Sequence, residues 1–454
     1  MGRVTRGRGR RAQKAVLLAR FVRARWGYRF RSRARFDAWQ ARRIRSLLRR
    51  LETVPFYAGT HPRRLDDLPV TDKSTLLGSF DDLNTRGVRL ADALAVALEA
   101  ERTRDFSPTV DGDLAVGLSS GTSGRRGVFL VSPRERMLWA GTVLARVLDR
   151  RSLGRLLRPW QPPLEIAFFL RAGGTLYESV GSSRIHFTFF DLTLPLADHL
   201  AVIGTAGAPA VEVLVAPASV LRSLAEAAER GETALRPRLV VSVAEVLEPE
   251  TVDAVRRAWG VRPRQVYQAT EGLLALSCER GALHLNEESV LIERLYLDAD
   301  HRRFTPLVTD FDRRTQIIAR HALDDVLRID PEAPERCACG RVTTVLTAVD
   351  GRADAVLRLP SLDGRALVDV YPDAVRQAMA RGSASYADWR IRQTGVDVHV
   401  AFADPAPDAA DRAAAALTEL FARYGCTAAI VVEPWPPVDP GAKMRRIVRE
   451  GLPS

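Results

Sequence analysis

LAVGLSSGTSGRRGVFLVSP, residues 114–133, places a loop of glycine and hydroxyl residues between two apolar stretches. The apolar flanks predict two short strands, and the loop between them consists of Ser119, Ser120, Gly121, Thr122, Ser123 and Gly124. Small residues let a backbone approach a ligand closely, and amides and hydroxyls can donate to an anion. The loop therefore favours phosphate binding, with a flexible connection as the alternative. It is not the GxxxxGK[ST] loop, because no lysine follows and the exit is strand-like.

Apolar, β-branched runs alternate with helical patterns in the middle of the chain. VEVLVAP (211–217), PRLVVSVAE (237–245) and RPRQVYQAT (262–270) read as buried strands, and residues 219–229 and 249–258 have helical spacing. Such alternation is typical of parallel sheets flanked by helices. We therefore expect an α/β fold.

The pattern changes toward the C-terminus. Residues 290–321 read as an antiparallel β segment, and a helix (372–381), a strand (395–402) and an Ala-rich helix (408–423) follow. The sequence predicts three parts, which are a basic N-terminal extension (1–35), a large domain of mainly parallel sheets flanked by helices plus a β segment (36–351), and a small mobile α+β domain (352–454).

Positive charge is concentrated at the start of the chain. Residues 1–50 hold 17 Arg, one Lys and one Asp, a net +17, so the other 404 residues carry −5 against the total of +12. Such a segment can bind nucleic acid or an anionic membrane surface. An Arg-rich extension, partly disordered and partly the solvated face of a helix (about 36–52), is the favoured interpretation, because no nucleic-acid motif accompanies it.

The composition is that of a globular protein, with 46% hydrophobic and 27% charged residues. No apolar run approaches the ~20 residues of a membrane span, and the N-terminus lacks the features of a secretory signal. The four cysteines form no regular framework, which suits a reducing compartment. We therefore expect a cytoplasmic protein without a membrane span, whose oligomeric state, a dimer included, stays open.

The Gly/Ser loop resembles the phosphate loop of the adenylate-forming superfamily, which includes acyl-CoA synthetases, luciferases and peptide-synthetase adenylation domains. VYQATEG (266–272), IIARHALDDV (317–326), VDGRADAVL (349–357) and PGAKMRR (440–446) resemble four further motifs of that family in the same order. The stretches VPFY (54–57) and LPVTDK look most like the phenylacetate–CoA ligase branch, which also contains deazaflavin-coenzyme synthetases. Gln268 stands where the family has Gly, and His321 where it has Tyr.

The resemblance implies a binding site for ATP and magnesium. In addition to the loop, its nucleotide-binding residues would be Ala244, Glu245, Tyr267, Asp325 and Arg352, with Thr270 donating to the α-phosphate and Glu271 holding magnesium. A carboxylate suits a hard cation that bridges phosphates.

Lys443 is one of only three lysines, beside Lys14 and Lys73, in a chain that has 67 basic residues. An ammonium is a compact point charge, whereas a guanidinium is a wide planar fork. In the family, the terminal lysine contacts the reacting carboxylate and the α-phosphate, so the resemblance makes Lys443 catalytic.

Cys278, His284, Cys337 and Cys339 form a second constellation. Three thiolates and one imidazole suit a structural tetrahedral zinc, and some members of the phenylacetate–CoA ligase branch look similar here. Buried free cysteines are the alternative.

The resemblance implies adenylation of a carboxylic acid and transfer of the acyl group to a thiol, of CoA or a carrier protein, or to an amine. Phe168, Phe169 and Arg171 are the predicted acid pocket, and the two aromatic rings favour an aryl or other flat apolar acid, although they suit a core as well. The alternatives are nucleotidyl transfer to a phosphate or other oxyanion, as in deazaflavin-coenzyme synthetases, and a catalytically silent protein that binds nucleic acid through its basic tail.

Overall fold

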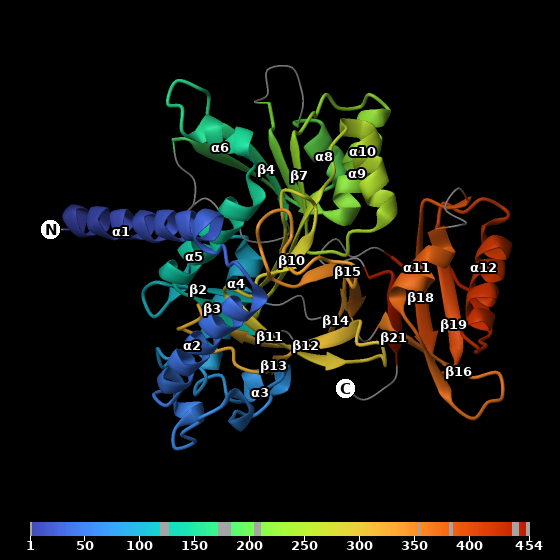
Figure 1. Cartoon of the computed structure of the whole chain (residues 1–454). Helices are drawn as coiled ribbons and strands as arrows, with labels where there is room; N and C mark the ends of the chain where they lie inside the picture. The colour runs from blue at the N-terminus through green and yellow to red at the C-terminus, as the bar shows by residue number, and fades with distance from the viewer. Residues whose placement is uncertain are drawn as a thin grey trace. The chain divides into compact units, whose positions relative to one another are not determined.

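The computed structural model describes residues 2–118, 127–170, 183–203, 210–352, 355–380, 385–437 and 445–450, and it describes all side chains in them except those of residues 2–10, 373 and 380. The chain forms two compact units (Figure 1). The first comprises Met1–Leu295, Pro306–Leu323 and Ile329–Thr347, and the second comprises Tyr296–Thr305, Asp324–Arg328 and Ala348–Ser454.

A parallel sheet is the centre of the first unit. Its strand order is β5-β4-β6-β7-β8, and antiparallel β9 and β10 and the start of β15 follow. The bounds are β4 (Leu164–Leu170), β5 (Ile185–Asp191), β6 (Val213–Pro217), β7 (Leu239–Val243), β8 (Arg264–Ala269), β9 (Gly272–Ser277), β10 (Leu283–Leu285) and β15 (Val345–Arg352). The three runs predicted as buried strands became β6, β7 and β8, so the predicted α/β class is confirmed.

Both faces of this sheet are covered, because alternate residues of a strand point to opposite sides. Phe169, Leu214 and Val240 face one side together with α8, α9 and α10. Ile166, Val213 and Val241 face the other side, where Val147 at the end of α5 packs. β6 and β7, in the middle of the sheet, are therefore apolar along almost their whole length, whereas the edge strand β5 alternates.

Helices, single turns and three smaller strand groups complete the first unit. The helices and turns are α1 (Gly2–Val22), the π-helical turn η1 (Arg23–Gly27), α2 (Arg33–Leu51), the 3₁₀ turns η2 (Pro55–Tyr57) and η3 (Leu65–Asp67), α3 (Lys73–Gly78), α4 (Leu90–Thr103), α5 (Pro133–Val147), α6 (Arg150–Leu156), α8 (Leu196–Leu200), α9 (Ala218–Glu229) and α10 (Pro249–Trp259). The strands are β1 (Thr109–Val110), β2 (Leu114–Leu118) and β3 (Val128–Val131), which form an antiparallel sheet, then β11 (Val290–Tyr296), and β12 (Arg303–Asp310) with its antiparallel partner β13 (His321–Ala322).

The basic N-terminus is packed into the first unit, where an extension was expected. α1 lies along α5 (Figure 1), and a Cβ at Gly141 of α5 would lie 2.7 Å from the carbonyl oxygen of Leu17. Arg20 is buried and donates to Thr142, Tyr28, Ser289 and Asp312. Three of these partners lie more than 100 residues away along the sequence, so the helix is held by tertiary contacts.

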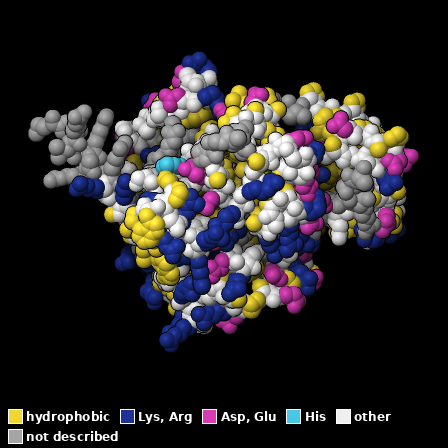
Figure 2. Space-filling view, turned by 90° about the horizontal axis from the view of Figure 1, so that it is seen from above, with side chains coloured by type: hydrophobic (Ala, Val, Ile, Leu, Met, Phe, Trp, Pro, Cys, Tyr) yellow, Lys and Arg dark blue, Asp and Glu magenta, His cyan; other side chains and the backbone are white. Residues whose placement is uncertain are grey.

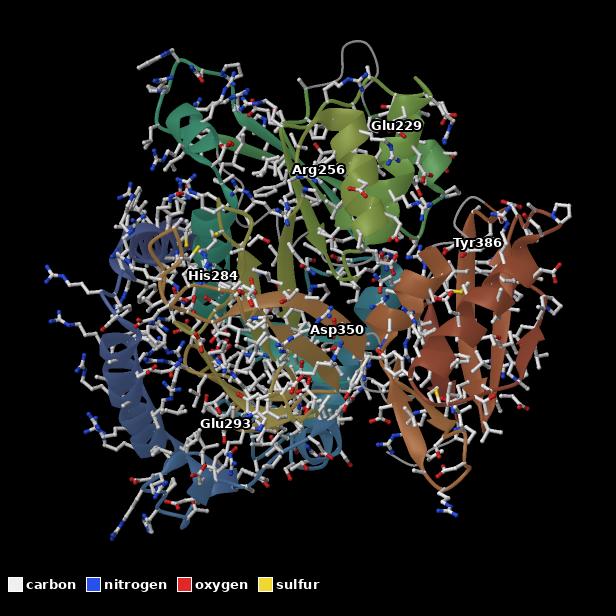
Figure 3. The ribbon with its side chains drawn as sticks, turned by 45° about the vertical axis from the view of Figure 1, so that its right-hand side comes forward. Glu229, Arg256, His284, Glu293, Asp350 and Tyr386 are labelled. Carbon is white, nitrogen blue, oxygen red and sulfur yellow. The ribbon has the colours of Figure 1, made fainter. Side chains whose placement is uncertain are left out.

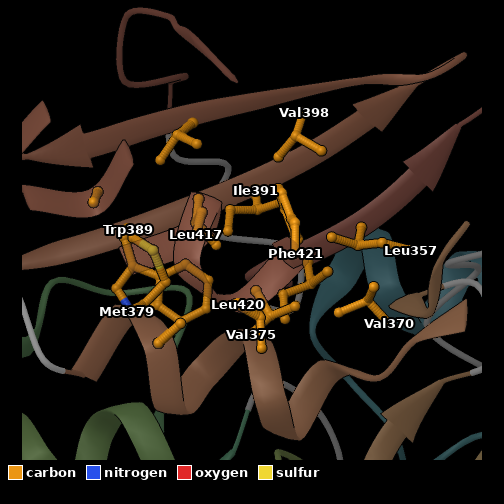
Figure 4. Close-up of a cluster of buried hydrophobic side chains, with 14 of the residues drawn as sticks. Leu357, Val370, Val375, Met379, Trp389, Ile391, Val398, Leu417, Leu420 and Phe421 are labelled. Carbon is orange, nitrogen blue, oxygen red and sulfur yellow. The ribbon is translucent and has the colours of Figure 1, made fainter. Parts of the chain in front are cut away.

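The second unit has its own core (Figure 4). Its sheet has the order β20-β19-β18-β21. The antiparallel hairpin β16-β17, which precedes these strands in the sequence, forms a separate two-stranded sheet. The core contains Trp389, Ile391 and Leu417 among others, all buried. The elements are β14 (Asp325–Ile329), β16 (Leu357–Pro360), β17 (Leu367–Val370), α11 (Pro372–Ala380), β18 (Asp388–Thr394), β19 (Asp397–Ala403), α12 (Ala409–Arg423), β20 (Ile430–Val432) and β21 (Ile447–Glu450).

Candidate functional site

The strands that flank the Gly/Ser loop are β2 and β3, which pair up to Leu118 opposite Val128. The loop therefore joins the two strands of a hairpin. Residues 119–124 themselves lie outside the described residues, as do Arg171 and Lys443.

Thr270 and Glu271 form the two-residue turn between β8 and β9, because Ala269 pairs with Gly272. Oε1 of Glu271 lies 3.8 Å from Nε2 of His321, and Nδ1 of His321 lies 3.2 Å from the hydroxyl of Thr71. A buried imidazole with one partner at each nitrogen has a fixed orientation. The histidine that replaces the family's tyrosine thus lies beside the predicted magnesium ligand.

Arg313 links this turn to the strand that leaves the Gly/Ser loop. It is 1% exposed, and its guanidinium donates to the carbonyl of Leu130 in β3 at 2.7 Å and to that of Thr270 at 2.6 Å. The same guanidinium lies 5.5 Å from the ring centroid of Trp139. One buried cation therefore holds two sequence-distant parts of the predicted nucleotide site in register.

Buried carboxylates surround Arg313. Burial alone would raise the pKa of Glu135, but the Arg313 charge and the backbone N–H groups that donate to it hold this pKa below its usual value. Burial, and secondly the charge of Asp312, raise the pKa of Asp310 to about 7. Oδ2 of Asp310 lies 3.1 Å from where a Cβ would stand on Gly272, so a larger residue directly after the Thr270–Glu271 turn would meet this carboxylate.

The predicted adenine-side residues lie at the ends of neighbouring strands. Ala244, which has a φ of 65°, follows β7 and is exposed. The carboxylate of Glu245 accepts from the backbone N–H of Ser219 at 2.9 Å, at the start of α9. Tyr267 is half-buried in β8, the next strand of the sheet. β7 and β8 are parallel neighbours, so these residues lie toward the carboxyl ends of adjacent strands.

The second unit holds the predicted ribose-side residues. Arg352 pairs with Asp324 at 2.9 Å, and the residue after Asp324, Asp325, begins β14. Asp350, two residues before Arg352, is fully buried and pairs with Arg303 at 3.3 Å and with Arg328 at 3.0 Å. The backbone before Arg352 is therefore fixed by a cluster of charges.

The two phenylalanines of the predicted acid pocket lie on opposite faces of the sheet. Phe169 is fully buried and stacks on Phe190, with ring centroids 4.5 Å apart, on the α8–α10 side of the sheet. Phe168 is half-buried on the opposite side, against Phe187. Neighbouring strand residues point to opposite faces, so the two rings cannot line one pocket, and Phe169 belongs to the core.

Cys278, His284, Cys337 and Cys339 come together, with their four ligand atoms all within 4.8 Å of one another. Figure 3 shows sulfur atoms gathered beside His284. Nδ1 of His284 lies 3.1 Å from the carbonyl of Thr343, and Nε2 lies 3.5 Å from the sulfur of Cys339. Donation from Nδ1 to that carbonyl leaves the lone pair of Nε2 facing the thiols, as a metal ligand requires.

Two similar turns carry three of these ligands. Cys278 and Cys337 each open a Cys-x-x-Gly turn, in which Gly281 (φ 86°) and Gly340 (φ 89°) donate to the cysteine carbonyls. Backbone N–H groups also point at the sulfurs of Cys278 and Cys337. A hydrogen bond from the Cys339 thiol, together with His284, lowers the pKa of the Cys278 thiol. The cluster thus favours a thiolate, which is the form that binds metal.

Sequence reasoning missed Arg313 and Asp350 and gave His321 no role of its own. Arg313 carries no local signal, since its partners Leu130 and Thr270 are 183 and 43 residues away. For the metal cluster, the repeated Cys-x-x-Gly spacing was a signal in the sequence that strengthens the prediction.

The two-unit α/β fold is similar to that of solved CoA ligases. In particular, it is similar to 2-hydroxyisobutyryl-CoA ligase in the postadenylation state in complex with R3-HIB-AMP, with 17% identity, a TM-score of 0.61 and 93% of this chain and 91% of that chain covered. An open conformation of the same ligase, in complex with 2-HIB-AMP and CoA, matches with 16% identity, a TM-score of 0.52 and 93% of each chain covered. A comparison with family models finds no match, and a comparison with curated protein sequences finds none either.

Proposed function

We propose that this protein adenylates a carboxylic acid with ATP, releases pyrophosphate, and transfers the acyl group to a thiol or an amine. The observation that carries the proposal is the Arg313 contact. Within an adenylate-forming fold, it ties the strand after the Gly/Ser loop to the turn that presents Thr270 and Glu271.

The residues of the first unit have separate roles in this proposal. The hydroxyls and amides of residues 119–124 bind the outer phosphates, Thr270 donates to the α-phosphate, and Glu271, oriented by His321, holds magnesium. Magnesium neutralises charge on the phosphates when it is bound. Phe168 and Arg171 stay candidates for the acid pocket, in keeping with a flat apolar acid.

The terminal lysine supplies the remaining charge. Lys443 contacts the carboxylate and the α-phosphate together, which favours the reaction by proximity and by electrostatic stabilisation. The acceptor is a thiol, as in the CoA ligases of similar fold, or an amine.

Pyrophosphate exchange into ATP, screened across aryl, aliphatic and amino acids, tests the first half-reaction. We expect at least one acid to stimulate exchange, and Lys443→Ala to lower the rate by about 10²–10³-fold. Lys14→Ala is the matched control, since Lys14 is an exposed lysine on α1. Exchange that no acid stimulates, or wild-type exchange in Lys443→Ala, would contradict the proposal.

We also propose a structural zinc at the Cys278, His284, Cys337 and Cys339 cluster. The donor set, the clustered ligand atoms and the N–H groups aimed at sulfur support a closed tetrahedral site. Zinc would join the turn after β9 to the turn before β15 within the first unit.

Metal analysis of the purified protein tests the zinc site. We expect about one zinc per chain, lost in Cys339→Ser together with thermal stability. Cys426→Ser is the control, because Cys426 is a buried free cysteine in the core of the second unit. Zinc retained in Cys339→Ser, or absent from wild type, would refute the assignment.

A further inference from the structure

The helix α1 buries a charged side chain and exposes two large apolar ones, which is unusual for a helix at a protein surface. Arg20 faces the protein and is 7% exposed, whereas Leu18 and Val22 are 61% and 47% exposed, and Trp26 in η1 is 50% exposed. At about 100° per residue, Arg20 lies on the opposite side of α1 from Leu18 and Val22. Leu18, Val22 and Trp26, spaced four residues apart, are named here the apolar stripe. Other apolar residues of this helix, such as Leu17 and Phe21, are half-buried, so the apolar stripe is a second, exposed apolar face. An exposed apolar face of this kind can contact a partner.

Exposed positive charge lies near the apolar stripe in sequence, on both sides of it and along α2. The exposed basic residues between residues 11 and 51 are Arg11, Lys14, Arg23, Arg29, Arg31, Arg35, Arg42, Arg45 and Arg49. These side chains form no ion pair among the described residues. The one exposed acid in this range, Asp37, pairs with Arg33 at 2.8 Å. Figure 2 shows one face of the molecule on which hydrophobic side chains lie next to Lys and Arg side chains.

We propose that α1 and η1 form a docking surface for an anionic lipid bilayer, bound in the plane of its headgroups. A tryptophan and aliphatic residues among cations match this interface, where apolar side chains enter the acyl boundary and cations meet lipid phosphates. Nucleic acid would use the cations but leave the apolar stripe in water. Among the described residues, no helix is long and apolar enough to cross a membrane.

Two arginines keep this surface in place. Arg20 ties α1 to Thr142 and Asp312 at 2.7 Å each, and Arg25 in η1 donates to the carbonyls of Ala145 and Leu148. The apolar stripe is therefore presented by a helix already anchored on the folded unit. Binding needs no unfolding of the segment, which lowers its entropic cost.

Flotation of the full-length protein with vesicles tests the proposal. We use phosphatidylcholine alone and phosphatidylcholine with about 30% phosphatidylglycerol, at low and high salt. We expect binding only to the anionic vesicles and release by salt. Leu18→Ser/Val22→Ser should weaken binding at least tenfold, and Arg11→Gln/Lys14→Gln/Arg23→Gln about a hundredfold, near fivefold for each charge.

The control is Leu362→Ser/Val396→Ser, two aliphatic residues of the second unit that are 68% and 52% exposed. It should bind vesicles as wild type does. Equal binding to neutral vesicles, or full binding by Leu18→Ser/Val22→Ser, overturns the proposal. The proposal is also overturned if the wild-type protein binds no vesicles but forms a dimer, and the double variant abolishes that dimer. A second copy of the chain would then cover the apolar stripe. Tighter binding to duplex DNA, unaffected by the double variant, overturns the proposal in favour of nucleic acid.

Discussion

Replacing Arg313 with methionine should be among the most damaging single changes in the first unit. The guanidinium makes two charge-assisted hydrogen bonds to main-chain carbonyls, each contributing about 1.5–3 kcal/mol, and its contact with Trp139 adds about 0.5–2 kcal/mol. Methionine fills much of the volume, but it leaves the Leu130 and Thr270 carbonyls without these donors. The nearby buried Glu135 also loses a compensating charge.

Because burying the cation itself has a desolvation cost, the net loss is smaller than the sum of its contacts. We expect Arg313→Met to lower the free energy of unfolding by about 3–5 kcal/mol, the range for breaking a buried charged network. Arg313→Lys keeps the charge but cannot reach both carbonyls as a fork does, so about half of the loss should remain.

Urea unfolding followed by circular dichroism measures both changes, and pyrophosphate exchange reports the position of Thr270 in Arg313→Lys. Arg42→Met is the control, because Arg42 is an exposed arginine of α2 and should change stability by less than about 0.5 kcal/mol. A loss below about 1 kcal/mol in Arg313→Met would show that Arg313 does not hold the two segments together.

Three further predictions address other parts of the chain. Burial raises the pKa of Asp310 to about 7, above its ordinary ~3.9, so the stability that this group contributes is complete below about pH 4 and is lost as the pH rises through 7. Asp310→Asn should therefore be more stable than wild type at pH 8, and this difference in stability should shrink toward pH 5. Thermal melts that give the same difference at both pH values would contradict this. Gly141→Ala should cost about 1–3 kcal/mol, because its Cβ would meet the Leu17 carbonyl, whereas Gly154→Ala in α6, where no atom lies within 4 Å, should be neutral or stabilising by up to about 1 kcal/mol in the same melts. Leu417→Ala should destabilise the second unit by about 2–5 kcal/mol in urea unfolding, and the exposed Leu362→Ala should not; equal effects would place Leu417 outside the core.

The parallel sheet could be predicted from sequence because its signal is local. A strand buried on both faces must be apolar throughout, and β6 (Val213–Pro217) shows this within five residues. The same alternation rule, applied strictly to the adjacent Phe168 and Phe169, would have placed them on opposite faces.

Contacts between segments far apart in the sequence could not be predicted, because no local sequence pattern indicates them. Arg20 reads as one arginine among seventeen in a basic segment, and its burial depends on Ser289 and Asp312, which a helical pattern cannot reveal. The cysteine cluster could be predicted, because soft ligands are rare in this chain and their chemistry narrows the choices. The charge cluster at Asp350 could not be predicted, because its two arginines come from separate strands.

The contacts of Arg20 also determine when α1 can be anchored during translation. Its partners Thr142, Ser289 and Asp312 follow it by 122, 269 and 292 residues. At about 5–20 residues per second, the last of them leaves the ribosome some 15–60 s after the arginine does. Through that interval this arginine-rich segment lies beside ribosomal RNA before its carboxylate partner Asp312 has been synthesised, so α1 can be secured only late in the synthesis of the first unit.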